Sequence, residues 1–353
     1  MLDVQSIIIY LGLAIILFFL AKYAELRKSS GAVWLIVILL SLISGLRADS
    51  VGIDTETYNT IFDLISKGVT KGIYGIEESF IYICRVLLGI WDNNQFLFLI
   101  FALISNGLII FTIWDNRYNI SFRWSVLSYY ITFFTFSLNG MRQFLAVSII
   151  VYATLFLKKG KYVKFIIFVL IASLFHRSAI IGVCYLLFEI IFVKYFESKR
   201  KLIIYLLVGI VVFFGIVATY GLVNYYSKYF EQQLSSMGIM MIVKAIMLIW
   251  SFGVIETPKN NQERYFCFSN RWYYFAGILL NSLNYIFVYM GRIGLYFYIF
   301  ESIYIGNIFK AKNKTIWTLM FKFCYVCLLL YYLYNNITRG GQGELPYRFF
   351  WQI

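Results

Sequence analysis

Residues 139–178 read NGMRQFLAVSIIVYATLFLKKGKYVKFIIFVLIASLFHRS, two apolar segments on either side of a lysine-rich turn. If segments 141–157 and 163–175 are antiparallel membrane helices, the turn lies at one face of the bilayer and both polar ends lie at the other. That second face then gathers the polar residues Asn139, Arg142, Gln143, His176, Arg177 and Ser178. We take this cluster as the candidate functional site.

The composition of the whole chain is that of an integral membrane protein. Of 353 residues, 61% are hydrophobic and 14% are charged, and the mean hydropathy is +0.76. Apolar runs long enough to span a bilayer recur along the chain, and we expect about twelve transmembrane helices. With 2 prolines and no long polar linker, the sequence predicts one all-α polytopic membrane domain over residues 1–353.

Short basic loops between the predicted spans set their orientation. The spans are expected at 6–21, 32–46, 95–114, 123–138, 141–157, 163–175, 179–193, 202–219, 238–255, 272–290, 293–309 and 315–334. By the positive-inside rule, the loops with most Lys and Arg are cytoplasmic, which places both termini outside. The outer segment 47–93 is expected to carry two short amphipathic helices. The net charge of +14 is spread over these loops, so it reflects topology and does not indicate nucleic-acid binding.

Four arginines fall at the outer ends of predicted helices, where basic residues are disfavoured. They are Arg47, Arg142, Arg177 and Arg292. A guanidinium binds phosphate oxygens through a fixed fork of donors, so four of them around one cavity would suit a lipid-linked diphosphate. The alternative is that each simply extends toward lipid headgroups at the interface.

His176 and Asp54 are the candidates for proton transfer. His176 is the only histidine, and its imidazole could act as a base or donate a hydrogen bond to phosphate; otherwise it is a packed interfacial residue. Asp54 could deprotonate a hydroxyl, or could be the N-cap of the helix that follows, or both. Glu77 and Glu78 are interpreted as acids at a helix start, where they need no further role.

No metal or cofactor motif is visible in the sequence. There is no second histidine, no Asp-x-Asp pair, no Gly-rich phosphate loop and no Gly-x-Ser-x-Gly motif. Cys324-x-x-Cys327 has the spacing of metal ligands, but it lies inside a predicted span without a second ligand pair. The sequence therefore predicts chemistry that needs neither metal nor cofactor.

Together these residues resemble a known family. The order Arg47, Gly52-x-Asp54, Tyr58, Glu78, Asn139-x-x-Arg142-Gln143, Phe175-His176-x-Ser178-Ala179, Arg292 and Tyr296 resembles the EpsG family of Wzy-type polysaccharide polymerases. The resemblance covers nearly the full chain. It is most specific at the Arg142-Gln143 pair and at the motif around His176.

The resemblance implies a metal-independent glycosyltransferase of the bacterial cytoplasmic membrane. Such a polymerase joins repeat units carried on a polyprenyl diphosphate, such as undecaprenyl diphosphate, at the outer membrane face, and makes exopolysaccharide, capsule or O-antigen. The flippase and the chain-length regulator of the same pathway are candidate partners, besides membrane lipids. We expect His176, Asp54 and Arg142 to be catalytic, the four arginines to hold diphosphate, and Asn139, Gln143, Ser178 and Tyr296 to bind substrate.

Two other functions are compatible with parts of the pattern. A flippase for lipid-linked oligosaccharides would need charges along a path through the whole bilayer, whereas here they collect at outer helix ends. A membrane acyltransferase using His176 would need a polar route for its acyl donor. The only charges expected deep in the membrane are Glu301 and Lys322. We expect them to form an ion pair, because they lie at matching depth in a predicted hairpin.

Overall fold

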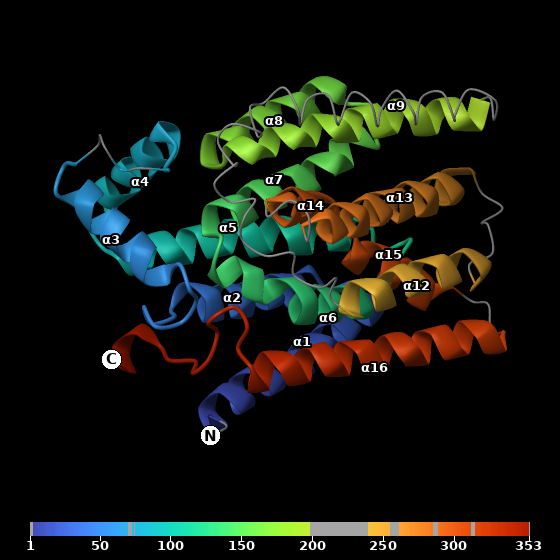
Figure 1. Ribbon diagram of the computed structural model, residues 1–353, viewed down its shortest axis with the longest axis horizontal. Helices are drawn as coiled ribbons and strands as arrows, with labels where there is room; N and C mark the ends of the chain where they lie inside the picture. The colour runs from blue at the N-terminus through green and yellow to red at the C-terminus, as the bar shows by residue number, and fades with distance from the viewer. Residues whose placement is uncertain are drawn as a thin grey trace.

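The computed structural model describes residues 3–69, 73, 75–197, 239–254, 261–284, 289–311 and 315–352. Within these ranges the chain is a bundle of helices whose long axes run mostly along the long axis of the molecule (Figure 1). The described part contains no strand, only an isolated antiparallel bridge between Arg47 and Phe349. The predicted span 202–219 lies outside the described residues.

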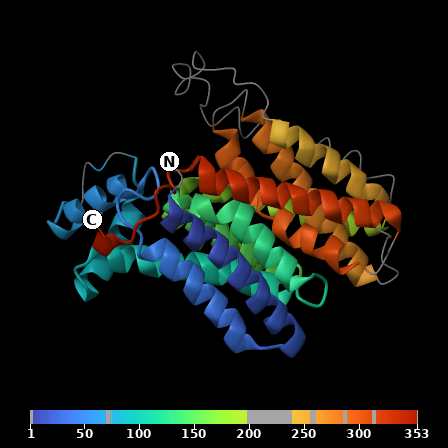
Figure 2. The same ribbon diagram turned by 90° about the horizontal axis from the view of Figure 1, so that it is seen from below.

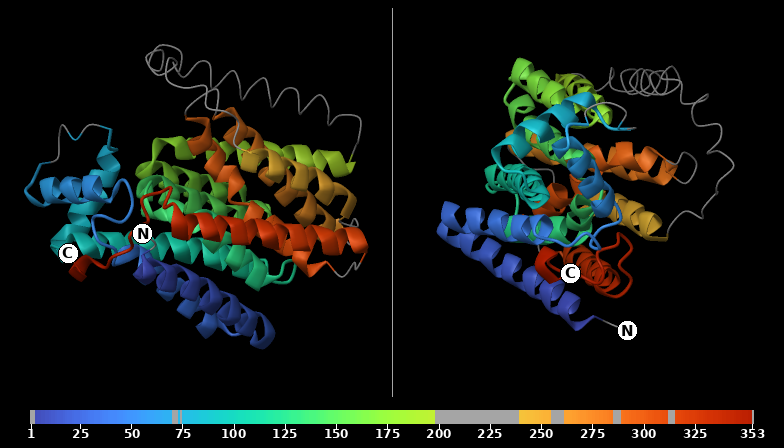
Figure 3. Two further views of the ribbon diagram at one scale, coloured as in Figure 1. Left: turned by 60° about the horizontal axis from the view of Figure 1, so that its bottom comes forward. Right: turned by 90° about the vertical axis from the view of Figure 1, so that its left-hand side faces the viewer.

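The N-terminal third is a helical hairpin with an extension at one end. Helix α1 (Val4–Arg27) and α2 (Ser30–Gly45) form the hairpin, and α2 packs along α5 (Asn94–Asp115). Helices α3 (Thr55–Ser66) and α4 (Glu78–Ile90) project from one end of the bundle (Figure 3). They are the two short amphipathic helices expected between 47 and 93; α3 buries one face, made of Tyr58, Ile61, Phe62 and Ile65.

The central helices follow the predicted hairpin closely. Helix α6 (Phe122–Phe133) passes through the 3-10 helix η1 (Phe134–Leu138) into α7 (Met141–Leu157), the most enclosed helix of this region. Helix α8 (Tyr162–Phe175) returns antiparallel to α7, as predicted from the lysine-rich turn. The predicted span 179–193 instead begins as a 3-10 helix, η2 (Arg177–Gly182), before α9 (Val183–Glu197).

The C-terminal helices depart more from the expectation. The structure has α12 (Ile239–Val254), α13 (Asn261–Leu283), α14 (Met290–Tyr298), α15 (Glu301–Lys310), α16 (Ile316–Thr338) and the short η4 (Phe350–Gln352). The predicted span 293–309 is broken between α14 and α15. Arg271, just before the predicted span 272–290, lies within α13, where its Nε donates to the Tyr304 hydroxyl at 2.9 Å. The Tyr304 hydroxyl satisfies a donor of the Arg271 guanidinium within the helix bundle.

Glycines allow α13 and α14 to pack closely. A Cβ at Gly277 would lie 2.4 Å from the Cα of Tyr298, and one at Gly294 would lie 2.7 Å from the Nδ2 of Asn281. Small residues at such crossings let two backbones approach. This contact fixes the start of α14, where Arg292 lies.

Three of the described helices, α1, α5 and α16, are long and apolar enough to cross a membrane. Helices α2, α7, α8 and the segment Met240–Gly253 are apolar but shorter. The predicted number of about twelve spans is therefore not confirmed. Large apolar side chains such as Ile8, Phe19 and Phe323 are exposed on outward faces, which suits a lipid environment better than water.

The predicted ion pair between Glu301 and Lys322 is wrong. Glu301 pairs with Lys244 of α12, with 2.7 Å between Nζ and Oε2, and both side chains are 1% exposed. The Tyr325 hydroxyl donates to the other oxygen of Glu301 at 2.8 Å. Lys322 instead donates to the main-chain oxygens of Phe309 and Ala311 at 3.4 and 3.2 Å, the free carbonyls at the end of α15. The break before Glu301 turns this residue toward α12.

The segment 339–349 continues from the end of α16 across the end of the bundle where α1 begins, and it passes beside α3 (Figure 2). We call it the returning segment. Arg348 forms an ion pair with Asp3 at 2.9 Å, and main-chain hydrogen bonds join Ala48 to Arg348 and Gly52 to Gly343. The returning segment therefore fixes the loop that leads from α2 to α3.

Candidate substrate pocket

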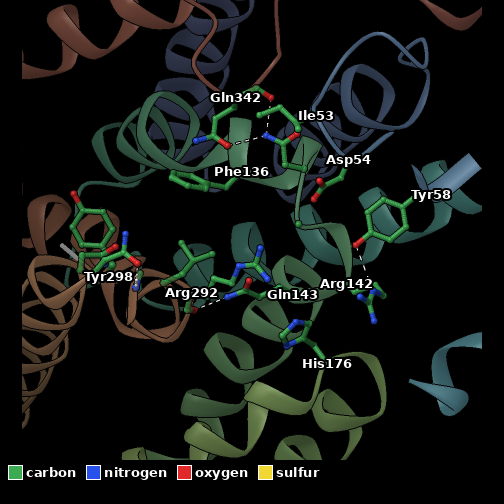
Figure 4. A pocket seen from close by; sticks show the side chains of 16 residues that line it. Ile53, Asp54, Tyr58, Phe136, Arg142, Gln143, His176, Arg292, Tyr298 and Gln342 are labelled. Carbon is green, nitrogen blue, oxygen red and sulfur yellow. Dashed lines mark hydrogen bonds between the residues drawn. The ribbon is translucent and has the colours of Figure 1, made fainter. Parts of the chain in front are cut away.

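A cavity of about 510 Å³ opens where the ends of α3, α7, α8 and α14 meet the returning segment (Figure 4). Of the residues singled out in the sequence, it is lined by Asp54, Tyr58, Asn139, Arg142, Gln143, His176 and Arg292. The structure thus brings together residues from 54 to 292 in the chain. It does not include Arg47 or Arg177 in this lining.

Arg142 lies in the first turn of α7 and is already engaged by the chain. Its guanidinium forms an ion pair with Glu77 and reaches the carbonyl of Gly75 at 3.2 Å and the hydroxyl of Tyr58 at 3.4 Å. The Arg142 and Glu77 side chains are only 12% and 11% exposed. Much of the positive charge of Arg142 is therefore neutralised locally.

Glu77 is a functional candidate that the sequence interpretation missed. It precedes α4 but makes no side-chain capping hydrogen bond there. One carboxylate oxygen contacts Arg142 and the other accepts from the main-chain N–H of Arg177 at 3.0 Å. Glu77 therefore ties α4 to the start of α7 and to the turn after α8. The signal available in the sequence was that Glu77 is an acid in the outer segment 47–93, predicted at the same membrane face as the four arginines.

Arg292 lies in the first turn of α14, and its guanidinium points into the cavity in Figure 4. Among the described residues no carboxylate forms an ion pair with it, and its Cζ lies 5.4 Å from the centre of the Tyr289 ring. Gln143 donates to the main-chain oxygen of Arg292 at 2.5 Å and so fixes α14 against α7. In the described structure Arg292 is the cation of the pocket without a carboxylate partner.

His176 ends α8, and its ring nitrogen Nδ1 faces the chain while the ring lines the cavity. Nδ1 accepts from the main-chain N–H of Ser178 at 3.3 Å and lies 2.6 Å from the Ser178 hydroxyl. That hydroxyl in turn lies 3.0 Å from the buried hydroxyl of Tyr296. Because Nδ1 accepts, the neutral tautomer carries its proton on Nε2, which is then a hydrogen-bond donor.

Burial lowers the pKa of His176 from its usual 6.5 to about 4, opposed by Glu77 and assisted by Arg142 and Arg292. The imidazole is therefore neutral around pH 7. Ser178 and Tyr296, which we expected to bind substrate, do not line the cavity: Ser178 contacts the ring of His176, and Tyr296 contacts the hydroxyl of Ser178.

Asp54 occupies the N-cap position of α3, and its side chain makes no capping hydrogen bond. It lines the cavity, and within the described ranges no donor is hydrogen-bonded to its carboxylate. Figure 4 shows Asp54 and His176 on opposite sides of the pocket. A free carboxylate and a neutral donor thus face the same space.

Two of the four arginines, Arg47 and Arg177, do not line the cavity. Arg47 is 1% exposed, donates to the carbonyls of Ser44 and Leu138 and stacks on Phe98 at 4.6 Å. Arg47 therefore connects the end of α2 to η1 through buried hydrogen bonds. Arg177 is exposed and lies outside the cavity lining.

Amide side chains make up much of the remaining lining. Asn281, Asn284 and Gln342 join Asn139 and Gln143, and three aromatic residues, Tyr58, Phe136 and Tyr298, also line the cavity. Sequence reasoning missed Asn281, Asn284 and Gln342, because isolated amides carry no pattern. In the described part of the chain, no group of three His, Cys, Asp or Glu residues could hold a metal ion.

Comparison with known proteins supports the family resemblance. The EpsG family matches residues 31–349, which includes every lining residue of the pocket. Searches of curated proteins and of solved structures found no match. The match covers well over half of the chain, and so the protein belongs to the EpsG family, the family of Wzy-type polysaccharide polymerases.

Proposed function

We propose that this protein polymerises oligosaccharide repeat units carried on a polyprenyl diphosphate, such as undecaprenyl diphosphate, at the outer face of the bacterial cytoplasmic membrane. The product would be an exopolysaccharide, a capsule or an O-antigen. The observation that supports it best is the layout of the pocket. Arg292 has no carboxylate partner among the described residues, and His176 is neutral, so both can donate hydrogen bonds to a diphosphate. Asp54 lines the same cavity, and no described donor is hydrogen-bonded to its carboxylate.

The proposed reaction is a direct displacement at the anomeric carbon of the growing chain. A sugar hydroxyl of the incoming unit attacks this carbon and passes its proton to Asp54. The bond between the anomeric carbon and the diphosphate oxygen breaks, and the diphosphate leaves with the electron pair. Arg292 and the Nε2–H of His176 stabilise the negative charge on the leaving oxygen. One displacement inverts the anomeric centre.

We infer different roles for the two pocket arginines from their contacts. Arg292 is available to bind phosphate oxygens through two donors. Arg142 is bound by Glu77, so it contributes mainly by holding the outer helices and the His176 turn in place. Arg47 and Arg177 are not part of the proposed diphosphate site, because they do not line the cavity.

Reconstitution of the purified protein in liposomes with a chemically defined lipid-linked repeat unit tests this proposal. We expect a ladder of products that differ by one repeat unit, and we expect it to persist in EDTA. The Asp54→Asn variant should form the ladder about 10²- to 10⁴-fold more slowly. Absence of a ladder from the wild type would overturn the proposal. Transfer of labelled lipid between leaflets without a ladder would indicate a flippase instead.

A further inference from the structure

The returning segment supplies one wall of the pocket. Gln342 lines the cavity together with Phe136 and Asn139, on the side away from His176 in Figure 4. No charged side chain of the returning segment takes part in this lining. The wall is therefore chemically different from the end of the pocket that contains Arg142 and Arg292.

Gln342 uses only part of its hydrogen-bonding capacity on the protein. Its side-chain Oε1 and its main-chain oxygen both accept from Nδ2 of Asn139, at 2.8 and 2.7 Å. Within the described ranges no acceptor is hydrogen-bonded to its Nε2 amino group, and this group is not among the enclosed polar atoms that lack a partner. The amino group thus keeps two accessible donors in a cavity large enough for a ligand.

The position of Gln342 is fixed by its neighbours. The main-chain N–H of Gln342 donates to the buried carboxylate of Glu344 at 2.6 Å. Gly343 has φ +71°, where a side chain would be strained, and a Cβ there would lie 3.0 Å from Ile53. Its carbonyl accepts from Gly52 at 2.7 Å. A side chain on such a fixed turn loses little further entropy when it binds a ligand.

The two side chains on this wall suit a sugar ring. An amide N–H₂ donates to hydroxyl or ring oxygens, and the half-buried ring of Phe136 offers an apolar face for the C–H side of a pyranose. A phosphate would instead prefer the cationic end. We propose that Gln342 and Phe136 form a sugar subsite, in which Nε2 of Gln342 donates to an oxygen of the sugar next to the diphosphate. This inference rests on the proposed polymerase function.

Gln342→Met tests the subsite. Methionine has nearly the same size and no donor, and Asn139 keeps the main-chain oxygen of residue 342 as its acceptor. We expect the affinity for the lipid-linked repeat unit to fall by about 3- to 10-fold, the effect of one neutral hydrogen bond. The affinity for the same polyprenyl diphosphate without sugar should not change. Gln352→Met, the same substitution at an exposed position, is the matched control.

Several outcomes would decide against the subsite. Equal affinity of Gln342→Met and wild type for the lipid-linked unit, or an equal loss for both lipids, would overturn it. If Gln342→Met does not accumulate in the membrane, the same two affinities measured on Phe136→Leu decide between a subsite and none. A wild type that makes no product ladder contradicts the polymerase function itself, whereas a normal wild type with an unaffected variant contradicts only the subsite.

Discussion

At the scale of single residues, the four arginines that the sequence places at outer helix ends have four different environments. Arg47 is buried among carbonyls, Arg142 is paired with Glu77, Arg177 is exposed, and Arg292 faces the cavity without a described carboxylate partner. The positive-inside rule could select these residues as unusual. The rule could not distinguish their environments, because carbonyls and acids far away in the sequence determine what each guanidinium contacts.

Substitution of the arginines by lysine should separate these roles. Arg292→Lys keeps the charge but loses the paired donors, so we expect kcat/KM for polymerisation to fall by about 10- to 100-fold with normal thermal stability. Arg177→Lys should be unaffected and serves as the control. Arg47→Lys should lower the melting temperature, since its buried carbonyl contacts are lost. Normal polymerisation by Arg292→Lys would remove this residue from the diphosphate site.

A second prediction concerns proton transfer by His176 and Asp54, which face each other across the pocket. If His176 acts as a neutral donor, His176→Gln should retain more activity than His176→Ala, because glutamine can place an N–H near Nε2. Asp54→Asn should lose about 10²- to 10⁴-fold, the usual contribution of a general base. A wild-type pH–rate profile should show no inflection near 6.5, because the pKa of His176 is about 4 in the free protein. An inflection near 6.5 that disappears in His176→Gln would show that the imidazole transfers the proton.

At the scale of elements, the α7–α8 hairpin was predictable because two uninterrupted apolar runs flank a cluster of lysines. The break between α14 and α15 was not, since no proline or glycine marks residues 299–300. Tertiary contacts explain it: Glu301 is held by Lys244 and Tyr325. Lys244 was overlooked because it stands alone in an apolar run.

The Lys244–Glu301 pair should be structural. Glu301→Gln leaves a buried ammonium without its carboxylate, which costs about 3–5 kcal/mol, so the variant should accumulate poorly and melt early. The double variant Glu301→Gln with Lys244→Met should recover both level and activity. Lys322→Met, at a half-buried position with only carbonyl partners, should behave like wild type. A double variant that is stable but inactive would place the pair in the chemistry.

At the scale of the whole molecule, the sequence predicted an all-helical bundle with polar helix ends gathered at one end, and the structure has both. It did not predict the returning segment as a pocket wall, because nothing local in residues 339–349 indicates what they contact. Membrane topology is the remaining prediction at this scale. The basic turn between α7 and α8 should be cytoplasmic, and the pocket should face outside.

Accessibility to a membrane-impermeant thiol reagent can measure this topology. In a background with the five native cysteines replaced, Arg177→Cys should react in intact cells and Lys159→Cys only after permeabilisation. Both positions are exposed, so labelling reports the side of the membrane rather than burial. Reaction of Arg177→Cys from the cytoplasm alone would invert the bundle and contradict catalysis at the outer face.

The returning segment also bears on how the protein is made. The ribosome synthesises Asp54 and helices α3 and α4 early, and it adds Gln342 only after every described helix that lines the pocket. Until then Asn139 lacks the Gln342 oxygens to which it donates, and Gly52 and Ala48 in the loop before α3 lack their acceptors, the main-chain oxygens of Gly343 and Arg348. An incomplete chain therefore lacks one lining residue of the pocket, and until synthesis has passed residue 348 it also lacks hydrogen bonds that fix the loop carrying Asp54.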